Sequence, residues 1–184
     1  MADPSRFRSR SFVCAQCRLD PMVVPPRDLA PAFVDAARRW RTLIETVLEH
    51  PGGADLLADR PSPTSWSAAE YAGHVRDVLT ATTLQVERML LATDPECDAW
   101  DLHGDVESGH YGAQCALALA DDLSVAAWEL AGLLSPMDDQ QRSRTGRVFA
   151  GRVTVDSQVR LALHECRHHL DDAHRAAAPP VLRS

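Results

Sequence analysis

The sequence contains no lysine, because all 19 of its basic residues are arginines. A Schiff-base mechanism and the lysine of a phosphate-binding loop are therefore both excluded. Acidic residues number 26 and give the chain a net charge of -7. This charge argues against nucleic acid as a partner, because a protein that neutralises phosphates needs a basic surface.

Long apolar runs are also missing, and none approaches the roughly 20 residues that a membrane span needs. The N-terminal residues MADPSRFR lack the apolar core of a secretory signal. We therefore expect a cytoplasmic protein with no membrane partner. Its five cysteines are expected to be thiols or metal ligands, because a disulfide framework belongs to oxidising compartments.

Apolar residues recur at helical spacing in four segments of the chain. Ser67 and Glu70 form a capping box at the start of the second segment, and Thr154 is a suitable N-cap for the fourth. Residues 142–153 alternate loosely and predict a loop or a small hairpin. The four predicted helices cover residues 28–50, 67–91, 115–135 and 155–175. They predict an all-α four-helix bundle over residues 28–176, with an irregular segment at 1–27 and a tail at 177–184.

Two histidines on the last predicted helix, His164 and His168, stand four residues apart. On a helix both imidazoles leave the same face, which is the spacing that offers two nitrogen ligands to one metal ion. Such a pair is more often a pair of ordinary core or surface histidines. His74 lies on the second predicted helix, at the edge of its apolar face, and is either a core histidine or a third ligand. Three ligands and a vacant position would be typical of catalytic metal.

Cys14 and Cys17 form a C-x-x-C pair in the irregular N-terminal segment. Such a pair is half of a zinc site or a redox pair. A zinc site needs two more ligands and no second C-x-x-C follows, whereas a thioredoxin-type pair needs a βαβ context that is absent. A separate metal site, a redox pair and no special role all remain open for these cysteines.

Three blocks of sequence resemble the actinobacterial branch of the DinB-like superfamily. Residues 66–79 (WSAAEYAGHVRDVL) are similar to its W-S-x-x-E-Y-x-x-H-x-R-D-V-L signature. Residues 154–157 (TVDS) and 163–170 (LHECRHHL) are similar to its T-V-x-S and L-H-x-x-x-H-H-L blocks. Residues 14–20 (CAQCRLD) resemble its C-P-x-C-G-F-D opening, although they lack its Pro, Gly and Phe. The run at 98–103 (DAWDLH) matches only partly, which leaves the substrate open.

The resemblance implies an up-down-down-up bundle, a homodimer, and a divalent ion such as zinc or nickel. By correspondence the metal ligands would be His74, His164 and His168. Relatives in the superfamily include thiol S-transferases and a mycothiol-dependent isomerase, which implies a low-molecular-weight thiol as co-substrate. A metal ion with an open position can bind such a thiol as thiolate at neutral pH.

Four further residues are weaker candidates for roles around this site. Asp77, one turn after His74, is either an orienting carboxylate or a surface charge. His169 points about 100° away from His168 and is interpreted as an outer-shell or surface residue. Tyr71 and Arg167 are candidate substrate contacts, with a core residue and a surface residue as the ordinary alternatives.

The favoured prediction is a metal-dependent thiol S-transferase that acts on a small electrophile. A metal-dependent hydrolase using metal-bound hydroxide is the alternative, with Asp77, Glu165 or Asp101 as candidate bases. A non-catalytic, stress-associated metal-binding bundle is the third possibility.

Overall fold

The computed structural model describes residues 13–97, 111, 114–148 and 151–178 of the chain. Four long helices dominate the described part, and short elements join them. In chain order the elements are η2 (Pro21–Val23), α1 (Pro26–Leu48), α2 (Gly53–Ala58), α3 (Ala68–Leu91), α5 (Ala116–Leu134), α6 (Asp139–Ser143), β1 (Thr145–Val148), β2 (Gly151–Thr154) and α7 (Val155–Ala176).

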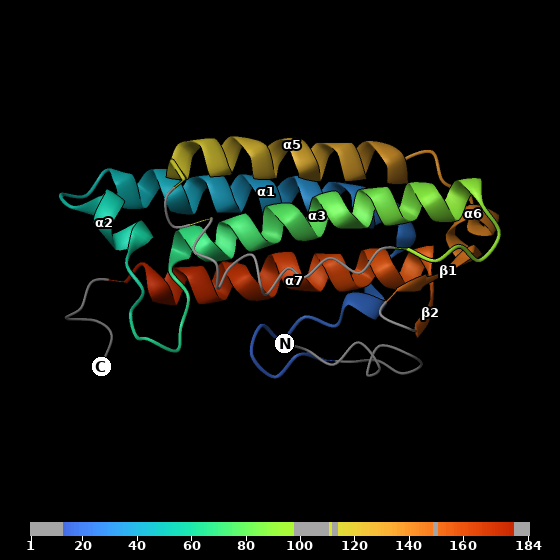
Figure 1. Ribbon diagram of the computed structural model, residues 1–184, viewed down its shortest axis with the longest axis horizontal. Helices are drawn as coiled ribbons and strands as arrows, with labels where there is room; N and C mark the ends of the chain where they lie inside the picture. The colour runs from blue at the N-terminus through green and yellow to red at the C-terminus, as the bar shows by residue number, and fades with distance from the viewer. Residues whose placement is uncertain (1–12, 98–110, 112–113, 149–150, 179–184) are drawn as a thin grey trace.

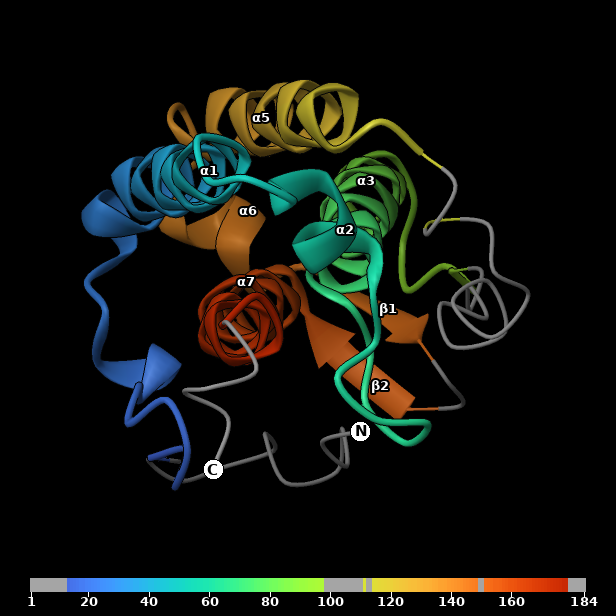
Figure 2. The same ribbon diagram turned by 90° about the vertical axis from the view of Figure 1, so that its left-hand side faces the viewer.

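The four long helices lie side by side as a bundle (Figure 1). Helices α1 and α7 run in one direction, and α3 and α5 run in the other. Viewed from the end, the order round the bundle is α1, α5, α3, α7, so α3 packs against both α5 and α7 (Figure 2). The predicted up-down-down-up four-helix bundle is confirmed.

Capping boxes set the starts of α3 and α7, as the sequence predicts. The Glu70 backbone N–H donates to Ser67 Oγ at 3.1 Å, and the Ser67 N–H donates to the Glu70 carboxylate at 2.7 Å. Thr154 and Ser157 form the equivalent pair at the start of α7. Each such cap stabilises a helix start by about 1 kcal/mol.

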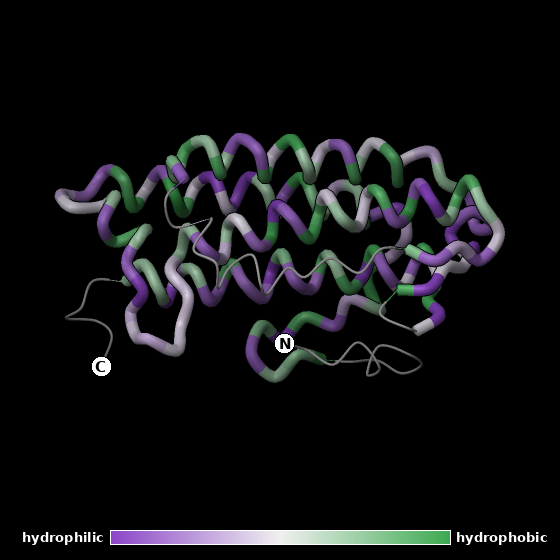
Figure 3. Tube along the Cα trace, in the orientation of Figure 1, coloured by the Kyte–Doolittle hydropathy of each residue, from purple (hydrophilic) through white to green (hydrophobic). Residues whose placement is uncertain are grey.

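The core lies between the four helices, and hydropathy alternates along each of them (Figure 3). Two buried polar contacts tie α7 to its neighbours. The Trp40 indole N–H donates to the Cys166 carbonyl oxygen at 3.0 Å, and Gln158 Nε2 donates to Gln85 Oε1 at 2.8 Å. None of the described helices is long and apolar enough to cross a membrane.

The predicted hairpin is present, with β1 and β2 pairing antiparallel from Thr145↔Thr154 to Val148↔Gly151. Thr154 is both the last residue of β2 and the N-cap of α7. Residues 13–24, called the N-terminal segment from here on, lie outside the bundle, along α7, and their η2 turn packs on that helix (Figures 1 and 2). Helix α7 is thus covered by α3 on one side and by residues 13–24 on another.

Candidate metal centre

One side of α7 carries a continuous arc of ionisable side chains. Five residues form it: His164, Glu165, His168, His169 and Asp172. At about 100° per residue they span roughly 140° of the helix surface. Residues of the N-terminal segment face one edge of the arc and residues of α3 face the other, so that two groups of potential metal ligands form.

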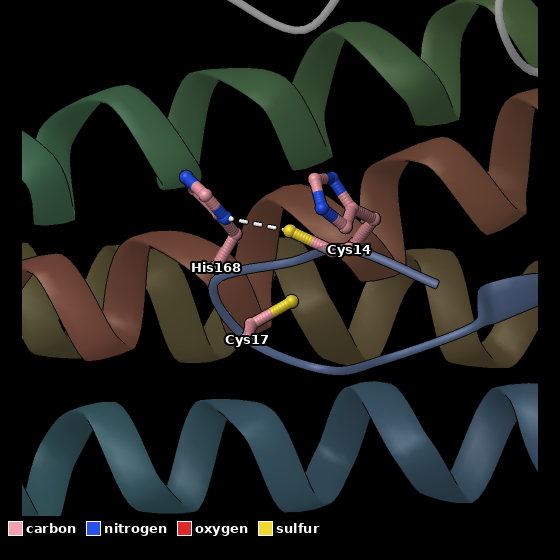
Figure 4. A group of neighbouring side chains, drawn as sticks. Cys14, Cys17 and His168 are labelled. Atoms are coloured by element: carbon pink, nitrogen blue, oxygen red, sulfur yellow. Dashed lines mark hydrogen bonds between the residues drawn. The ribbon is translucent and has the colours of Figure 1, made fainter. Parts of the chain in front are cut away.

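The first group joins the N-terminal segment to α7 and consists of Cys14, Cys17, His164 and His168. One ligand atom from each residue lies within 4.8 Å of all the others. Cys14 Sγ is 3.4 Å from His168 Nδ1, and the C-x-x-C turn lies across α7 (Figure 4). Cys14 and His164 are only 6% and 2% exposed, whereas the His168 side chain keeps 21% exposure, so this group is half-buried.

Carboxylates stand behind both histidines of the first group. His168 Nε2 lies 3.5 Å from Asp172 Oδ2, and His164 Nδ1 lies 3.3 Å from Glu165 Oε1. Histidines that bind metal through one ring nitrogen commonly place the other against a carboxylate, which orients the ring and raises its basicity. This arrangement is therefore suited to metal binding.

The second group joins α3 to α7 and consists of His74, Glu165 and His169. Glu165 Oε2 lies 3.8 Å from His74 Nε2 and 3.1 Å from His169 Nε2. His169 Nδ1 contacts Asp172 Oδ2 at 2.9 Å. His74 Nδ1 is buried and has no hydrogen-bond partner among the described residues. Glu165 thus contacts both groups, with one oxygen toward His164 and the other toward His74 and His169.

Asp172 is the second carboxylate shared by the arc. Its Oδ2 faces His168 and His169, while its Oδ1 accepts hydrogen bonds from Gln16 Nε2 at 2.6 Å and from Arg175. Asp172, His168 and His169 also form a third cluster of ligand atoms. Because both Asp172 oxygens are engaged, we interpret this residue as an orienting carboxylate for the two histidines.

Two aromatic side chains border the second group. The Tyr71 ring stacks on His169 at a centroid distance of 5.3 Å, and the Trp66 ring lies 5.2 Å from that of His74. The side chains of His74, Glu165 and His169 retain 10%, 19% and 15% exposure. This group is therefore partly exposed and is bordered by two aromatic rings.

Contacts within and beside the arc favour the charged forms of three side chains. Burial opposes a positive charge on His169, but Asp172 and Glu165 outweigh it and raise the His169 pKa to about 9. Burial would raise the pKa of Glu165, yet its contacts with His164, His169 and His74 hold that pKa well below its usual value. Burial would also raise the pKa of Cys14, but hydrogen bonding with His164 and the backbone of the turn lowers it to about 6.

The structure places the predicted ligands in two groups. His164 and His168 lie together, as their spacing predicts, while His74 lies with His169 and Glu165. Each residue step turns the helix by about 100°, so His164 and His168 face the N-terminal segment whereas Glu165 and His169 face α3. Cys14 and Cys17 supply the partners of the histidine pair.

The weaker candidates occupy different places. Tyr71 contacts His169, and Arg167 is partly exposed on α7. Asp77 accepts hydrogen bonds from Arg76 Nε at 2.8 Å and from the Tyr111 hydroxyl. Asp77 thus faces Arg76 and Tyr111, whereas the carboxylate that contacts His168 and His169 is Asp172, which the sequence did not single out.

The sequence held a signal for the placement of both carboxylates, Glu165 and Asp172. Glu165 precedes His169 by four residues and Asp172 follows His168 by four, which puts each pair on one helix face. Asp101 and the rest of the run at 98–103 lie outside the described residues.

No protein-family model matches the chain, and no curated protein matches it either. Among solved structures it is similar to YfiT from Bacillus subtilis, described as a probable metal-dependent hydrolase with an unusual four-helix bundle topology. The superposition has a TM-score of 0.74 and covers 92% of this chain and 90% of YfiT, with 12% sequence identity. The fold is shared. The four-helix bundle predicted from the sequence is thereby supported as the fold.

Proposed function

We propose that the protein is a metal-dependent enzyme that hydrolyses a small molecule at the group formed by His74, Glu165 and His169. The observation that carries this proposal is the convergence of two imidazole Nε2 atoms on one carboxylate oxygen, at 3.8 and 3.1 Å. Two histidines and one glutamate are a donor set of catalytic zinc sites, which keep a further position open.

The spacing of these atoms fits a divalent ion. Ligands at 2.0–2.1 Å from a tetrahedral zinc lie about 3.3 Å from one another. The two nitrogen–oxygen distances bracket that value. The buried Nδ1 of His74 and the partial exposure of all three side chains agree with a site that has a donor set on one side and access on the other.

The protein's own residues prepare this site for catalysis. Asp172 engages His169 Nδ1, which leaves Nε2 directed at Glu165 Oε2. Trp66 and Tyr71 shield one flank from water and offer an apolar surface to the substrate. When bound, a divalent ion supplies Lewis acidity, which polarises an acyl or phosphoryl oxygen and makes water a stronger nucleophile at neutral pH.

The similarity to YfiT supports hydrolysis as the reaction, because that protein has the same bundle and is described as a probable metal-dependent hydrolase. At 12% identity this support extends to the kind of reaction and not to a substrate.

Thiol S-transfer, with mycothiol as co-substrate, is the second candidate function. The group contains one carboxylate and two imidazoles, so a divalent ion there would keep a net positive charge. That charge would favour an anionic small molecule, which includes a thiolate as well as a hydrolysable anion. The homodimer implied by the sequence resemblance also remains a prediction, and sedimentation would measure it.

The two functions separate in one set of assays. Protein reconstituted with zinc or nickel is incubated with chromogenic esters, amides and phosphoesters, and in parallel with mycothiol and an alkylating probe. We expect hydrolysis above the rate of free metal, and loss of that activity in His169→Ala. His174→Ala is the matched control, because His174 is exposed on the same helix.

Conjugation of mycothiol without hydrolysis would replace the first function by the second. If neither reaction exceeds its background, or if His169→Ala keeps full activity, the proposed site is wrong. Metal binding without either reaction would favour the non-catalytic alternative.

A further inference from the structure

The geometry points to a second, structural metal site in this protein, in which Cys14, Cys17, His164 and His168 hold one zinc ion. This site is separate from the proposed catalytic group, and it does not depend on the protein being an enzyme. Its role would be to fasten the N-terminal segment to α7.

The donor chemistry selects zinc. Two thiolates and two imidazoles form a Cys₂His₂ set, which is a tetrahedral structural zinc site in many small domains. The spacing, C-x-x-C followed by H-x-x-x-H, falls within the ligand spacing of such sites. Hard ions such as magnesium and calcium prefer oxygen ligands and would not choose this set.

The four side chains already converge. Both cysteine sulfurs point toward α7, with Cys14 Sγ at 3.4 Å from His168 Nδ1 (Figure 4). All four ligand atoms lie within 4.8 Å of one another, although the two cysteines are about 150 positions from the histidines in the chain. Four protein donors fill the tetrahedral coordination of a zinc ion, which indicates a structural and not a catalytic role.

The turn that carries the cysteines is built to hold them. The Arg18 N–H donates to the Cys14 carbonyl oxygen at 2.8 Å, and the Cys14 N–H donates to the Leu19 carbonyl oxygen at 3.0 Å. Arg18 has a φ of 55°, the left-handed region that non-glycine residues seldom occupy. Such a conformation persists where the surroundings over-determine it, and four ligands on one ion would do so.

Two other contacts fasten the same segment to α7. Gln16 Nε2, between the two cysteines, donates to Asp172 Oδ1 at 2.6 Å. Buried Arg160 donates to the carbonyl oxygens of Pro21 and Val24 at 2.6 and 2.7 Å. The zinc site would thus complete an attachment that runs from Cys14 to Val24.

This attachment also reaches the proposed catalytic group. Glu165 faces His164 through Oε1 and faces His74 and His169 through Oε2. Asp172 contacts histidines of both groups. A zinc ion that fixes His164 and His168 would therefore help to hold the two carboxylates in place for the neighbouring group.

The test combines metal analysis with cobalt substitution. The full chain is purified without chelators, and zinc is measured per chain in the wild type, Cys17→Ser and Cys115→Ser. Cys115 is exposed and serves as the matched control. We expect Cys17→Ser to hold one ion fewer than Cys115→Ser. With Co²⁺, the sulfur-to-metal charge-transfer absorption should disappear in Cys17→Ser and persist in Cys115→Ser and His169→Ala.

This design separates the two metal proposals. In His169→Ala, loss of one ion with retention of the thiolate absorption supports the structural site whether or not the protein shows activity. X-ray absorption on the wild type needs no variant, and it should show zinc–sulfur distances of about 2.3 Å. This measurement decides the matter if Cys17→Ser does not fold.

Three results would overturn the proposal. One is equal metal content in Cys17→Ser and Cys115→Ser. Another is a wild-type zinc spectrum without sulfur ligands, together with metal loss in His74→Ala, which would favour the three-histidine set. The third is a Cys14–Cys17 disulfide in the metal-loaded protein, found by thiol counting, which would make the pair a redox pair.

Discussion

The two edges of the α7 arc differ in composition and in the number of their donors. The edge that faces the N-terminal segment combines two sulfur and two nitrogen donors, which would close the coordination of one ion. The edge that faces α3 combines two nitrogen donors with one oxygen donor, which would leave a position open. Closed, sulfur-rich sites are typical of structural metal, and open sites with three ligands are typical of catalysis. One helix can thus present a structural and a catalytic donor set about 100° apart.

The largest effect is expected from Glu165→Gln, because Glu165 is the residue that the two edges share. It would lose an anionic ligand on the open edge, so hydrolysis should fall to the rate of the metal-free protein. On the closed edge it would lose only an orienting carboxylate, which lowers metal affinity by about 10–100-fold. Activity assays measure the loss of hydrolysis, and competition with a chelator measures the loss of metal affinity. Equal losses of affinity at the two ions would contradict the distinction between the edges.

Cys17→Ser should act on the closed edge alone and reduce stability. Binding of a structural ion contributes to folding, and at saturating metal its loss would lower the free energy of unfolding by several kcal/mol, on the order of the linkage that tight binding provides. Urea unfolding with and without chelator measures this change. In Cys115→Ser the chelator effect should match that of the wild type. If chelator does not change the unfolding curve of the wild type, the closed edge holds no stabilising ion and the comparison of the two edges fails.

Asp172→Asn should weaken both edges moderately, because Asp172 contacts His168 and His169. Loss of an orienting carboxylate lowers metal affinity or activity by about 10–100-fold. Titration with metal gives the affinity of each edge: cobalt absorption follows binding at the closed edge, and activity follows binding at the open edge. Glu129→Gln, exposed on α5, is the control and should leave both unchanged.

The smallest effect is expected from Glu70→Gln, which weakens the capping box at the start of α3. This helix carries His74 to the open edge. Burial would raise the pKa of Glu70, but Arg60 and the Ser67 N–H outweigh it and lower that pKa. A lowered folded-state pKa contributes stability above the unfolded value of about 4.3, and the contribution is lost as the pH falls through the folded value. Glu70→Gln should therefore cost about 2 kcal/mol at neutral pH and less in acid.

The free energy of unfolding, measured for the wild type and Glu70→Gln from pH 7 to pH 3, tests the direction of this pH dependence. The difference between the two proteins should shrink as the pH falls. A constant difference would show that the Glu70 carboxylate contributes no charge-dependent stability.

Much of the fold was predictable from local patterns. Periodic apolar residues located all four long helices, the Ser67 and Thr154 caps located two of their starts, and the loose alternation at 142–153 gave the hairpin. These signals are local because helical spacing and capping depend on residues within one or two turns. The short helix α6 was not predicted, since five residues are too few to show a period.

The candidate site was predictable only in part. Spacing identified His164 and His168, and the C-x-x-C pair was left open because its two further ligands could not be named. The ligand partners depend on which way each face of α7 points once the bundle has formed. No local rule relates Cys14 to His168, or His74 to His169.

The sequence by itself determined the donors that are available: a helix bearing histidines and carboxylates, a capped helix bearing His74, and a turn bearing two cysteines. Tertiary structure alone decided how these donors combine. Packing of α7 between α3 and the N-terminal segment sorts neighbouring residues by helix rotation, because a step of about 100° sends adjacent side chains to different partners. His168 consequently meets sulfur, while His169, its neighbour in the chain, meets a carboxylate and an aromatic ring.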